Sequence, residues 1–410
     1  MFSVDEAVHC IMESVKVMDS ESVPLTDGLN RVLAGDVVAC MDLPPFSHAT
    51  VDGFAVLHED VEQASRERGV PLRVVGTICA GSVARKTVRR GLAVRIMTGA
   101  PLPPGADAVV KEEDTSPRKK TTPLIHVEKP VAAMENVAST GEDVRRGEVV
   151  LEKGTALRPE NIGILASLGL QQVVVFRQPE IALLSTGDEL VGLREDLGGG
   201  RIFASSFYVL LAKIRESDCI PMALGIVGDD GASIEKRIRS GLAANAIITI
   251  GGTRRGDSDW VRDVYGKMEI HSQIDGVAMS PGGSFAFGLL KGKPIFSLPG
   301  SPTASVVAFE ELVRPSLLKM RGISGGQSLA RPTVKMSLGG RTRGKRGLRK
   351  YVLARIVVKD GRFTAIPINR ARRGAVTPMV QANGIVVLPE GESEVHAGEE
   401  VLVRLVDLNL

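Results

Sequence analysis

The sequence predicts a multidomain α/β protein in which a parallel α/β domain is combined with two smaller β domains. The chain has 410 residues, more than a single hydrophobic core usually organises. Between about residues 180 and 320, apolar strand-like runs alternate with amphipathic helical segments, a pattern typical of a parallel sheet covered on both faces. On both sides of this region, the pattern changes to short strands separated by Gly and Pro.

The first segment of the chain is predicted to be a helix. Ser3 and Glu6 form a capping box, and Ala7, Ile11 and Val15 then repeat on one helical face. From about residue 40 to 141, short runs such as 72–76 and 93–97 alternate with turns rich in Gly and Pro. These runs predict a small β domain.

The central region contains the strand–helix alternation. Pro159 near the start and Gly169 after the end bound a predicted helix, 159–168, which the apolar run 173–176 follows. The elements expected after it are strands at 181–184, 221–227, 246–250 and 294–298, and helices at 207–216, 233–242 and 303–320. Ser301 is the expected N-cap of the last helix and Pro302 its first residue.

The C-terminal region from about residue 326 is predicted to be a second β domain. Its expected strands are 352–358, 363–368, 384–388 and 400–406, with Gly turns between them. A basic run also lies in this region. The favoured interpretation of this run is a solvated loop, and the alternative is contact with a nucleic acid or with a ligand's phosphates. The run consists of Arg341, Arg343, Lys345, Arg346, Arg349 and Lys350.

Composition narrows the classes of function. The formal net charge of +3 is too small to indicate nucleic-acid binding, and no apolar stretch approaches the roughly 20 residues of a membrane span. The N-terminus has no signal-peptide pattern, so we expect a cytoplasmic protein. The four cysteines lie far apart without a CxxC or Cys/His cluster, which favours reduced thiols over disulfides or a zinc site: Cys10, Cys40, Cys79 and Cys219.

The residues that can carry chemistry follow three predicted strands. They are Ser185-Thr186-Gly187-Asp188-Glu189-Leu190, Gly251-Gly252-Thr253-Arg254-Arg255-Gly256-Asp257-Ser258-Asp259 and Pro299-Gly300-Ser301-Pro302. Ligands of open parallel sheets bind beyond the carboxyl ends of the strands, where these segments should meet. Glycines allow backbone N–H groups to approach phosphate oxygens, and a helix N-terminus adds partial positive charge. Acids beside phosphates imply a cation such as Mg²⁺ between them.

These three segments resemble the STGDEL, GGxSxGxxD and LPGNP segments of the molybdopterin molybdenumtransferase family, which includes bacterial MoeA and the gephyrin E domain. The resemblance extends over essentially the full chain, in the same order as in the family. Further matching segments are 44–56, 95–103, 106–110, Gly141-Glu142-Asp143, 285–288 and Ala382-Asn383-Gly384.

The resemblance implies a four-part subunit. A scaffold domain would comprise 1–40 plus 142–178, an inserted β domain 41–141, a MogA-like parallel α/β domain that binds molybdopterin 179–325, and a C-terminal β barrel 326–410. Members of the family are homodimers whose site lies between the α/β domain of one subunit and the inserted domain of its partner. The implied reaction takes adenylylated molybdopterin and molybdate with Mg²⁺, releases AMP and places molybdenum on the dithiolene sulfurs.

The resemblance also assigns residue roles. The catalytic acids would be Asp52, Asp143, Glu189 and Asp259, with Asp52 reaching in from the partner subunit, and the cation would be held by Asp188, Glu189 and Asp259. Asp229 also matches a family carboxylate, but it precedes a helix and is the acid most easily explained as a cap. The substrate would be bound by Thr98, Gly99, Ser185, Thr186, Gly187, Gly251, Gly252, Arg254, Arg255, Gly256, Pro299, Gly300, Ser301 and Pro302.

The basic residues of the family site are largely replaced. The arginine run before Gly141-Glu142-Asp143 is Ala138-Ser139-Thr140 here, and the K-P-G-K-P segment is Ser280-Pro281-Gly282-Gly283-Ser284. Two Asn positions carry Ser206 and Ser301, and Arg254 occupies a family Ser position. Each lost charged hydrogen bond is worth about 1.5–3 kcal/mol, so Arg254 and Arg255 would have to compensate.

Three hypotheses of function remain open from the sequence. The first is Mg²⁺-dependent molybdenum insertion. The second is a molybdopterin or cofactor carrier, or a scaffold for a molybdoenzyme or cofactor-pathway partner, without turnover. The third is hydrolysis of another nucleotide by the same kind of α/β domain. A small-molecule pterin nucleotide is the expected ligand in the first two, and neither a membrane nor a nucleic acid is an expected partner.

Overall fold

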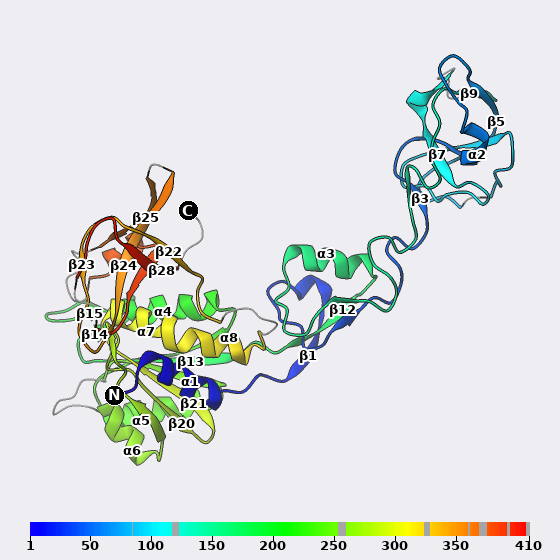
Figure 1. Cartoon of the computed structure of the whole chain (residues 1–410). Helices are drawn as coiled ribbons and strands as arrows, with labels where there is room; N and C mark the ends of the chain where they lie inside the picture. The colour runs from blue at the N-terminus through cyan, green and yellow to red at the C-terminus, as the bar shows by residue number, and fades with distance from the viewer. Residues whose placement is uncertain are drawn as a thin grey trace. The chain divides into compact units, whose positions relative to one another are not determined.

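The computed structural model describes residues 1–83, 85–116, 123–252, 260–323, 329–359, 361–368, 375–391 and 394–406. The chain divides into two compact units (Figure 1). The larger unit contains Met1–Gly35, Lys153–Arg158 and Gln172–Leu410, and the smaller unit contains Asp36–Glu152 and Pro159–Gln171.

A six-stranded sheet forms the centre of the larger unit. Its strands in spatial order are β16 (Ile220–Val227), β13 (Glu180–Thr186), β17 (Ala246–Ile250), β21 (Lys293–Leu298), β20 (Ala286–Leu290) and β18 (His271–Asp275). The first four strands are parallel, as predicted. Two strands that the sequence did not predict, β20 and β18, add an antiparallel pair at one edge of the sheet. Such an antiparallel edge is common in α/β sheets.

Helices cover both faces of this sheet (Figure 1). Alternate residues of β13 face opposite sides, because successive side chains of a strand point to opposite faces. Leu183 packs in one core with Phe207 and Leu210 of α4 (Ser205–Glu216). Leu184 packs in the other core with Ile234 and Ile238 of α5 (Gly231–Gly241), which α6 (Trp260–Lys267) accompanies. The short strands β14 (Leu190–Val191) and β15 (Ile202–Phe203) pair beyond the end of β13.

Helix α1 (Val4–Ser14) confirms the predicted capping box. The Ser3 hydroxyl accepts the Glu6 N–H, and the Glu6 carboxylate accepts the Ser3 N–H at 2.8 Å. Ala7 and Ile11 are fully buried in the core that also contains α4. The first helix of the chain therefore packs on the central α/β sheet.

The predicted helix 303–320 is interrupted by a π-helical turn. Helix α7 (Pro302–Ala308) is followed by the π-helical segment Phe309–Val313 and then by α8 (Arg314–Met320). The turn buries two consecutive acids, Glu310 and Glu311, which are 2% and 3% exposed. A single period of 3.6 residues therefore does not continue through this helix, contrary to the prediction.

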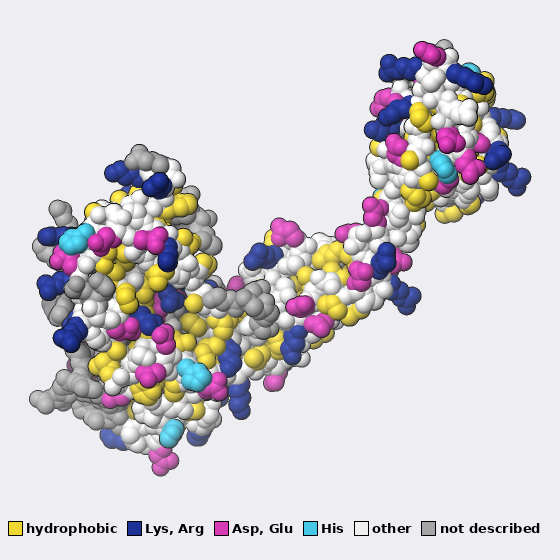
Figure 2. All heavy atoms as spheres, in the orientation of Figure 1, with side chains coloured by type: hydrophobic (Ala, Val, Ile, Leu, Met, Phe, Trp, Pro, Cys, Tyr) yellow, Lys and Arg dark blue, Asp and Glu magenta, His cyan; other side chains and the backbone are white. Residues whose placement is uncertain are grey.

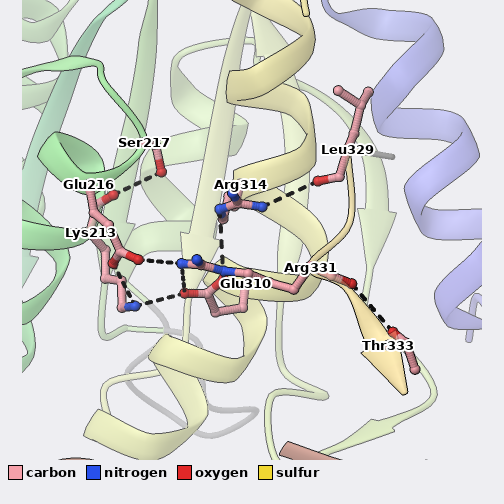
Figure 3. A network of polar contacts seen from close by, with 8 residues as sticks. All are labelled: Lys213, Glu216, Ser217, Glu310, Arg314, Leu329, Arg331 and Thr333. Atoms are coloured by element: carbon pink, nitrogen blue, oxygen red, sulfur yellow. Dashed lines mark hydrogen bonds and ion pairs between the residues drawn. The ribbon is translucent and has the colours of Figure 1, made fainter. Parts of the chain in front are cut away.

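Both acids of the π-helical turn form buried ion pairs. A Glu310 carboxylate oxygen lies 2.9 Å from Lys213 Nζ on α4, and the other lies 3.0 Å from Arg331 Nε, which precedes the C-terminal strands (Figure 3). Glu311 lies 3.0 Å from a guanidinium nitrogen of Arg404 on β28 (Glu400–Leu405). The turn thereby connects the central sheet's helices to the C-terminal domain.

The C-terminal domain is a closed barrel. Its strands in order are β24 (Arg349–Lys359), β25 (Arg362–Pro367), β22 (Thr333–Leu338), β28 (Glu400–Leu405) and β26 (Gly384–Leu388), and β26 pairs again with β24. This closure confirms the predicted barrel, although β22 was missed. Two short strands pair beside it, β23 (Thr342–Arg343) and β27 (Glu394–Val395), and α9 (Thr377–Gln381) precedes β26. A further short strand, β19 (Met279–Ser280), pairs with the first residues of β24.

The sequence suggested that the basic run at the start of the barrel is a solvated loop. The structure corrects this for its last two residues, which belong to β24. Arg349 belongs to β24, and its guanidinium nitrogens lie 2.7 and 2.8 Å from the Asp5 carboxylate of α1. Its Nε also lies 3.2 Å from Glu390. These pairs join the barrel to the first helix of the chain.

The larger unit also contains the antiparallel pair β1 (Ser20–Pro24) and β12 (Gln172–Phe176). The smaller unit is built on a six-stranded sheet of β7 (Ala108–Lys111), β4 (Gly53–Val56), β6 (Leu92–Ile96), β5 (Val70–Ile78), β9 (Leu124–Val127) and β8 (Thr115–Ser116). Separate cores lie on its two faces: Phe54 belongs to one and Ala55 to the other. The predicted small β domain is therefore present.

The rest of the smaller unit is mostly short elements. They are α2 (His58–Val61), α3 (Pro159–Ser167) and the antiparallel pairs β2 (Val37–Val38) with β11 (Val149–Leu151) and β3 (His48–Ala49) with β10 (Val137–Ala138). Short 3₁₀ turns occur at Leu25–Asp27 in the larger unit and at Glu112–Asp114 in the smaller one.

The surface carries charges of both signs. Lys and Arg side chains are interspersed with Asp and Glu over the visible face of each unit (Figure 2). Within the described part of the chain, no helix has the length and apolar character required to cross a membrane.

Candidate functional site

The three segments singled out from the sequence follow neighbouring parallel strands of the central sheet. Ser185 of β13 is in register with Ile250 of β17, and Ile250 is in register with Leu298 of β21. The segments that begin at Thr186, Gly251 and Pro299 therefore leave the sheet side by side at its carboxyl edge. This is the edge at which ligands of open α/β sheets bind.

Gly251 sits where two of these segments nearly touch. Its N–H donates to the Leu298 carbonyl oxygen at 3.0 Å, and its φ of +94° lies in the region that favours glycine. A Cβ atom at this position would lie 2.4 Å from the Thr186 carbonyl oxygen and 3.0 Å from Thr186 Oγ1. Glycine is therefore required at this position.

Two acids, Asp188 and Glu189, follow β13, and a third, Asp229, follows β16. Asp188 Oδ1 accepts the backbone N–H of Asp229 at 2.9 Å, which connects the two segments. Burial, together with the neighbouring charges of Asp188 and Glu189, raises the pKa of Asp229 above its usual value. The ionised form of Asp229 is thus disfavoured beside Asp188 and Glu189, and a bound cation would relieve this repulsion.

Asp229 is not the cap of the helix that follows it. Asp230 caps α5, because its carboxylate accepts the N–H groups of Ala232 at 3.3 Å and Ser233 at 2.9 Å. The interpretation of Asp229 as a cap is therefore wrong, and its half-buried carboxylate remains beside Asp188 and Glu189.

The acids suit a hard cation that also binds the substrate. Among the described residues, no three His, Cys, Asp or Glu side chains are arranged to hold a metal ion. Mg²⁺, however, usually takes only one or two protein carboxylates and completes its octahedron with phosphate oxygens and water. Asp188 and Glu189 are exposed oxygen donors of this type, so the donor set fits Mg²⁺ bound together with a phosphate ligand.

The third segment leads into α7. Ser301 occupies the N-cap position and Pro302 the first turn, as predicted, but the Ser301 side chain makes no capping hydrogen bond. The Ser206 hydroxyl donates to the Gly300 carbonyl oxygen at 3.1 Å, so α4 holds this segment in place. Ser185 Oγ is buried without a hydrogen-bond partner in the described part of the chain.

Four predicted site residues lie outside the described residues: Arg254, Arg255, Gly256 and Asp259. The structure therefore gives the flanks of their loop, which are Gly252, two residues after the end of β17, and the start of α6 at Trp260.

Three predicted site residues lie together in the smaller unit. Asp52 Oδ1 accepts both the backbone N–H of Thr98 at 2.7 Å and its hydroxyl at 2.8 Å. Gly99 follows with a φ of +76°, and its N–H donates to the Ala49 carbonyl oxygen at 2.8 Å. Asp143, in contrast, has an exposed side chain, and its backbone N–H donates to the Leu43 carbonyl oxygen.

Comparison with known proteins gives consistent matches along the chain. Residues 2–169 match the model of the MoeA N-terminal region (domain I and II), residues 182–319 that of a probable molybdopterin binding domain, and residues 335–406 that of the MoeA C-terminal region (domain IV). A molybdopterin molybdenumtransferase of Staphylococcus epidermidis is 31% identical over 99% of this chain and 96% of its own. One from Staphylococcus aureus is 32% identical over 98% and 95%.

The chain belongs to the molybdopterin molybdenumtransferase family. The fold agrees with this assignment. A crystal structure of the molybdopterin biosynthesis MoeA protein from Pyrococcus horikosii superimposes with a TM-score of 0.84, at 31% identity and over 99% of both chains. The MoeA-like arrangement of a MogA-like α/β domain, an inserted β domain and a C-terminal barrel is therefore confirmed. The protein acts in molybdenum cofactor biosynthesis.

The structure places Lys350 of the larger unit differently from the prediction. The basic run that contains Lys350 was expected to be a solvated loop. Lys350 instead lies on β24, and its side chain is half-buried. Alternation of buried residues around it, with Tyr351 and Leu353 in the core, was the available signal that it belongs to a strand rather than to a loop.

Proposed function

We propose that this protein inserts molybdate into adenylylated molybdopterin and releases AMP, with Mg²⁺ as the required cation. The observation that carries the proposal is the carboxyl edge of the central sheet. There, close contacts that require glycine bring the loops together beside Asp188, Glu189 and Asp229, and the first two acids together with burial raise the pKa of Asp229. This edge belongs to a chain that matches molybdopterin molybdenumtransferases over nearly its full length.

In this proposal, the larger unit binds the nucleotide part of the substrate. Gly251, Gly252 and Gly300 allow the backbone to approach the phosphates closely, and Ser185, Thr186, Gly187, Pro299, Ser301 and Pro302 complete the binding surface. Asp188 and Glu189 hold the cation, with Asp259 as a further ligand. When bound, Mg²⁺ neutralises the phosphate charge that these acids would otherwise repel.

The reaction exchanges two groups on one substrate. Water attacks the AMP phosphorus, the bond between that phosphorus and the oxygen of the pterin phosphate breaks, and AMP leaves while the pterin keeps its phosphate. Molybdate becomes bound through molybdenum to the two dithiolene sulfurs, and one of its oxides leaves as water with the two thiol protons. The residues of this chain would orient the diphosphate and stabilise its charge, which is the larger part of catalysis in phosphoryl transfer.

We further propose that the protein works as a homodimer with a composite site. Asp52, Thr98 and Gly99 of one subunit would face the Asp188 edge of the other, with Asp143 also contributing an acid. The four-part division at 1–40 plus 142–178, 41–141, 179–325 and 326–410 belongs to this proposal. So does a cytoplasmic location, which agrees with four free cysteines.

A second candidate is a carrier or scaffold that binds molybdopterin without turnover. It is favoured by one observation: the described segments 185–192, 225–231, 251–252, 276–285 and 298–303 contain no Lys or Arg. Stabilising a diphosphate and molybdate in the transition state requires positive charge. Arg254 and Arg255 would supply it in the enzymatic proposal.

The two candidates differ in AMP release. We expect the purified protein with Mg²⁺ to release AMP from adenylylated molybdopterin only after molybdate is added. Binding of the substrate without AMP release at any molybdate concentration would favour the carrier. Release of AMP that depends neither on molybdate nor on the pterin would instead indicate a general nucleotide hydrolase.

Substitutions at Asp188 and Asp230 test where the cation binds. Asp188→Asn keeps an acceptor for the Asp229 N–H but removes a charge from the cation site, so it should raise the Mg²⁺ concentration needed for half-maximal activity about tenfold or more. Asp230→Asn, the control, keeps a good helix cap and should leave the Mg²⁺ requirement unchanged. Equal Mg²⁺ requirements in both variants would remove Asp188 from the cation site.

A further inference from the structure

The loop between β18 and β20 reaches the same edge of the sheet as the candidate site. Ala286 of β20 is in register with Ser297 of β21, one residue before that strand ends, so the loop 276–285 leaves the sheet beside the Pro299–Pro302 segment. Gly282 packs against α7: a Cβ atom there would lie 3.4 Å from the Ala308 Cβ. This loop is therefore a wall of the candidate site.

The C-terminal barrel pairs directly with this wall. The Arg349 N–H donates to the Ala278 carbonyl oxygen at 2.9 Å, and β19 runs parallel to the start of β24. In this pairing, Met279 is in register with Arg349, and Ser280 is in register with Lys350. Since residues in register point to the same side of a sheet, the barrel places a lysine next to Ser280.

Lys350 is a half-buried cation without an acidic partner in the described part of the chain. Its ammonium group donates to the Arg343 carbonyl oxygen, and no carboxylate there forms an ion pair with it. The neighbouring acids Asp5 and Glu390 are both paired with Arg349 instead. Burial lowers the pKa of Lys350, as expected when no nearby negative charge offsets the loss of water.

The charge of this edge makes the position of Lys350 significant. The described segments 185–192, 225–231, 251–252, 276–285 and 298–303 carry the acids Asp188, Glu189 and Asp229 and contain no Lys or Arg. A ligand with phosphate groups requires cations as well as a metal ion. Lys350, which has no acidic partner among the described residues and is in register with Ser280 of this loop, fits that need.

We propose that Lys350 binds an oxyanion of the substrate, either a phosphate of the pterin nucleotide or molybdate, at the barrel side of the site. The proposal rests on the proposed function and extends it to a residue on the C-terminal domain. The barrel then contributes positive charge to a site that is built mainly by the central sheet.

Two substitutions separate the charge of Lys350 from its structural contact. Lys350→Gln keeps a donor for the Arg343 carbonyl and removes the charge, whereas Lys350→Arg keeps both. Calorimetry with pyrophosphate and, separately, with molybdate should show binding weakened about tenfold or more in Lys350→Gln for one of the two anions. Lys350→Arg should retain most of the affinity. The anion whose affinity falls identifies the group that Lys350 holds.

A control lies at the other end of the same strand. Lys359 is exposed, so Lys359→Gln should bind both anions like the parent protein. If Lys350→Gln binds both anions as tightly as Lys359→Gln does, the proposal is overturned. This outcome is independent of AMP release, so a protein that binds anions through Lys350 but never turns over would refute only the proposed enzymatic function.

Labelling of the unmodified protein covers the case in which Lys350→Gln does not fold. An amine-reactive reagent should modify Lys350 more slowly in the presence of pyrophosphate or molybdate, and mass spectrometry of the peptides would measure this rate. The rate at Lys359 should stay constant. Equal rates at Lys350 with and without both anions would contradict the proposal.

Discussion

Gly251 and Asp229 show how single residues define the candidate site. Glycine at 251 is required by a contact with the Thr186 carbonyl oxygen, and a motif rich in glycine already predicts such an approach. The cap of α5 was not predictable in the same way. Asp229 and Asp230 are equally good capping residues in sequence, and the choice depends on Asp188, which lies far away in the chain and accepts the Asp229 N–H.

Replacing Gly251 by Ala should destabilise the protein. The added Cβ would lie 2.4 Å from a backbone oxygen, and the positive φ adds strain, so we expect a loss of about 1–3 kcal/mol in the free energy of unfolding. Urea denaturation measures it. The control is Gly266→Ala on α6, where nothing lies within 4 Å of an added Cβ and a gain of about 0.5–1 kcal/mol is expected. Similar effects of both changes would contradict the close contact.

At the level of elements, periodicity predicted most strands and helices but missed the π-helical turn. The run 303–320 is apolar enough on all sides to suggest one continuous helix. The turn instead buries Glu310 and Glu311, whose partners Arg331 and Arg404 lie on segments remote in sequence. Local pattern carries no information on such long-range ion pairs. The antiparallel strands β18 and β20 were missed for a related reason, since β18 is mostly exposed and not strongly apolar.

The two acids of the turn should respond differently to pH. Lys213 and Arg331 hold the pKa of Glu310 below its usual value despite burial, whereas burial raises the pKa of Glu311. The contribution of Glu310 to stability is therefore present above the unfolded-state pKa of about 4.3 and is lost as the pH falls through its lower folded pKa. The pH dependence is opposite for Glu311. Its contribution to stability is complete below the unfolded-state pKa and is lost as the pH rises through its higher folded pKa.

Glu310→Gln should cost about 3 kcal/mol of unfolding free energy at pH 7, because it leaves buried cations unpaired (Figure 3). The difference from the parent protein should shrink when the pH falls below the pKa of Glu310. Glu311→Gln should cost less at pH 7, since burial disfavours the ionised form of Glu311 and offsets part of its ion pair with Arg404. Urea denaturation at neutral and acidic pH tests both. A Glu310→Gln penalty that stays constant with pH would refute the role of its charge.

At the scale of the whole molecule, ordered motifs along the chain predicted the family, and the comparisons confirm it. The same motifs could not predict the pairing of β19 with β24, because register between distant segments is set by tertiary packing. The role of Lys350 therefore emerged only from the structure. Whether Arg254 and Arg255 complete the anion site is likewise not decided by sequence, since side-chain direction in a loop depends on the surrounding fold.

The composite site predicts a homodimer. Light scattering at micromolar concentration should give twice the 43.6 kDa mass of one chain. Asp52 and Thr98, which hydrogen-bond each other on the smaller unit, would then have a partner subunit's ligand to face. A mass equal to one chain would contradict both the dimer and the composite site.

In the proposed function, the carboxyl edge of the sheet couples AMP release to molybdenum insertion. The most direct measurement is a single-turnover experiment with adenylylated molybdopterin, Mg²⁺ and molybdate, in which released AMP and pterin-bound molybdenum are determined in the same samples. We predict that the two appear together in equal amounts and that neither appears when molybdate is omitted. Bound pterin nucleotide that remains intact in the presence of molybdate, or AMP released without incorporated molybdenum, would contradict the account.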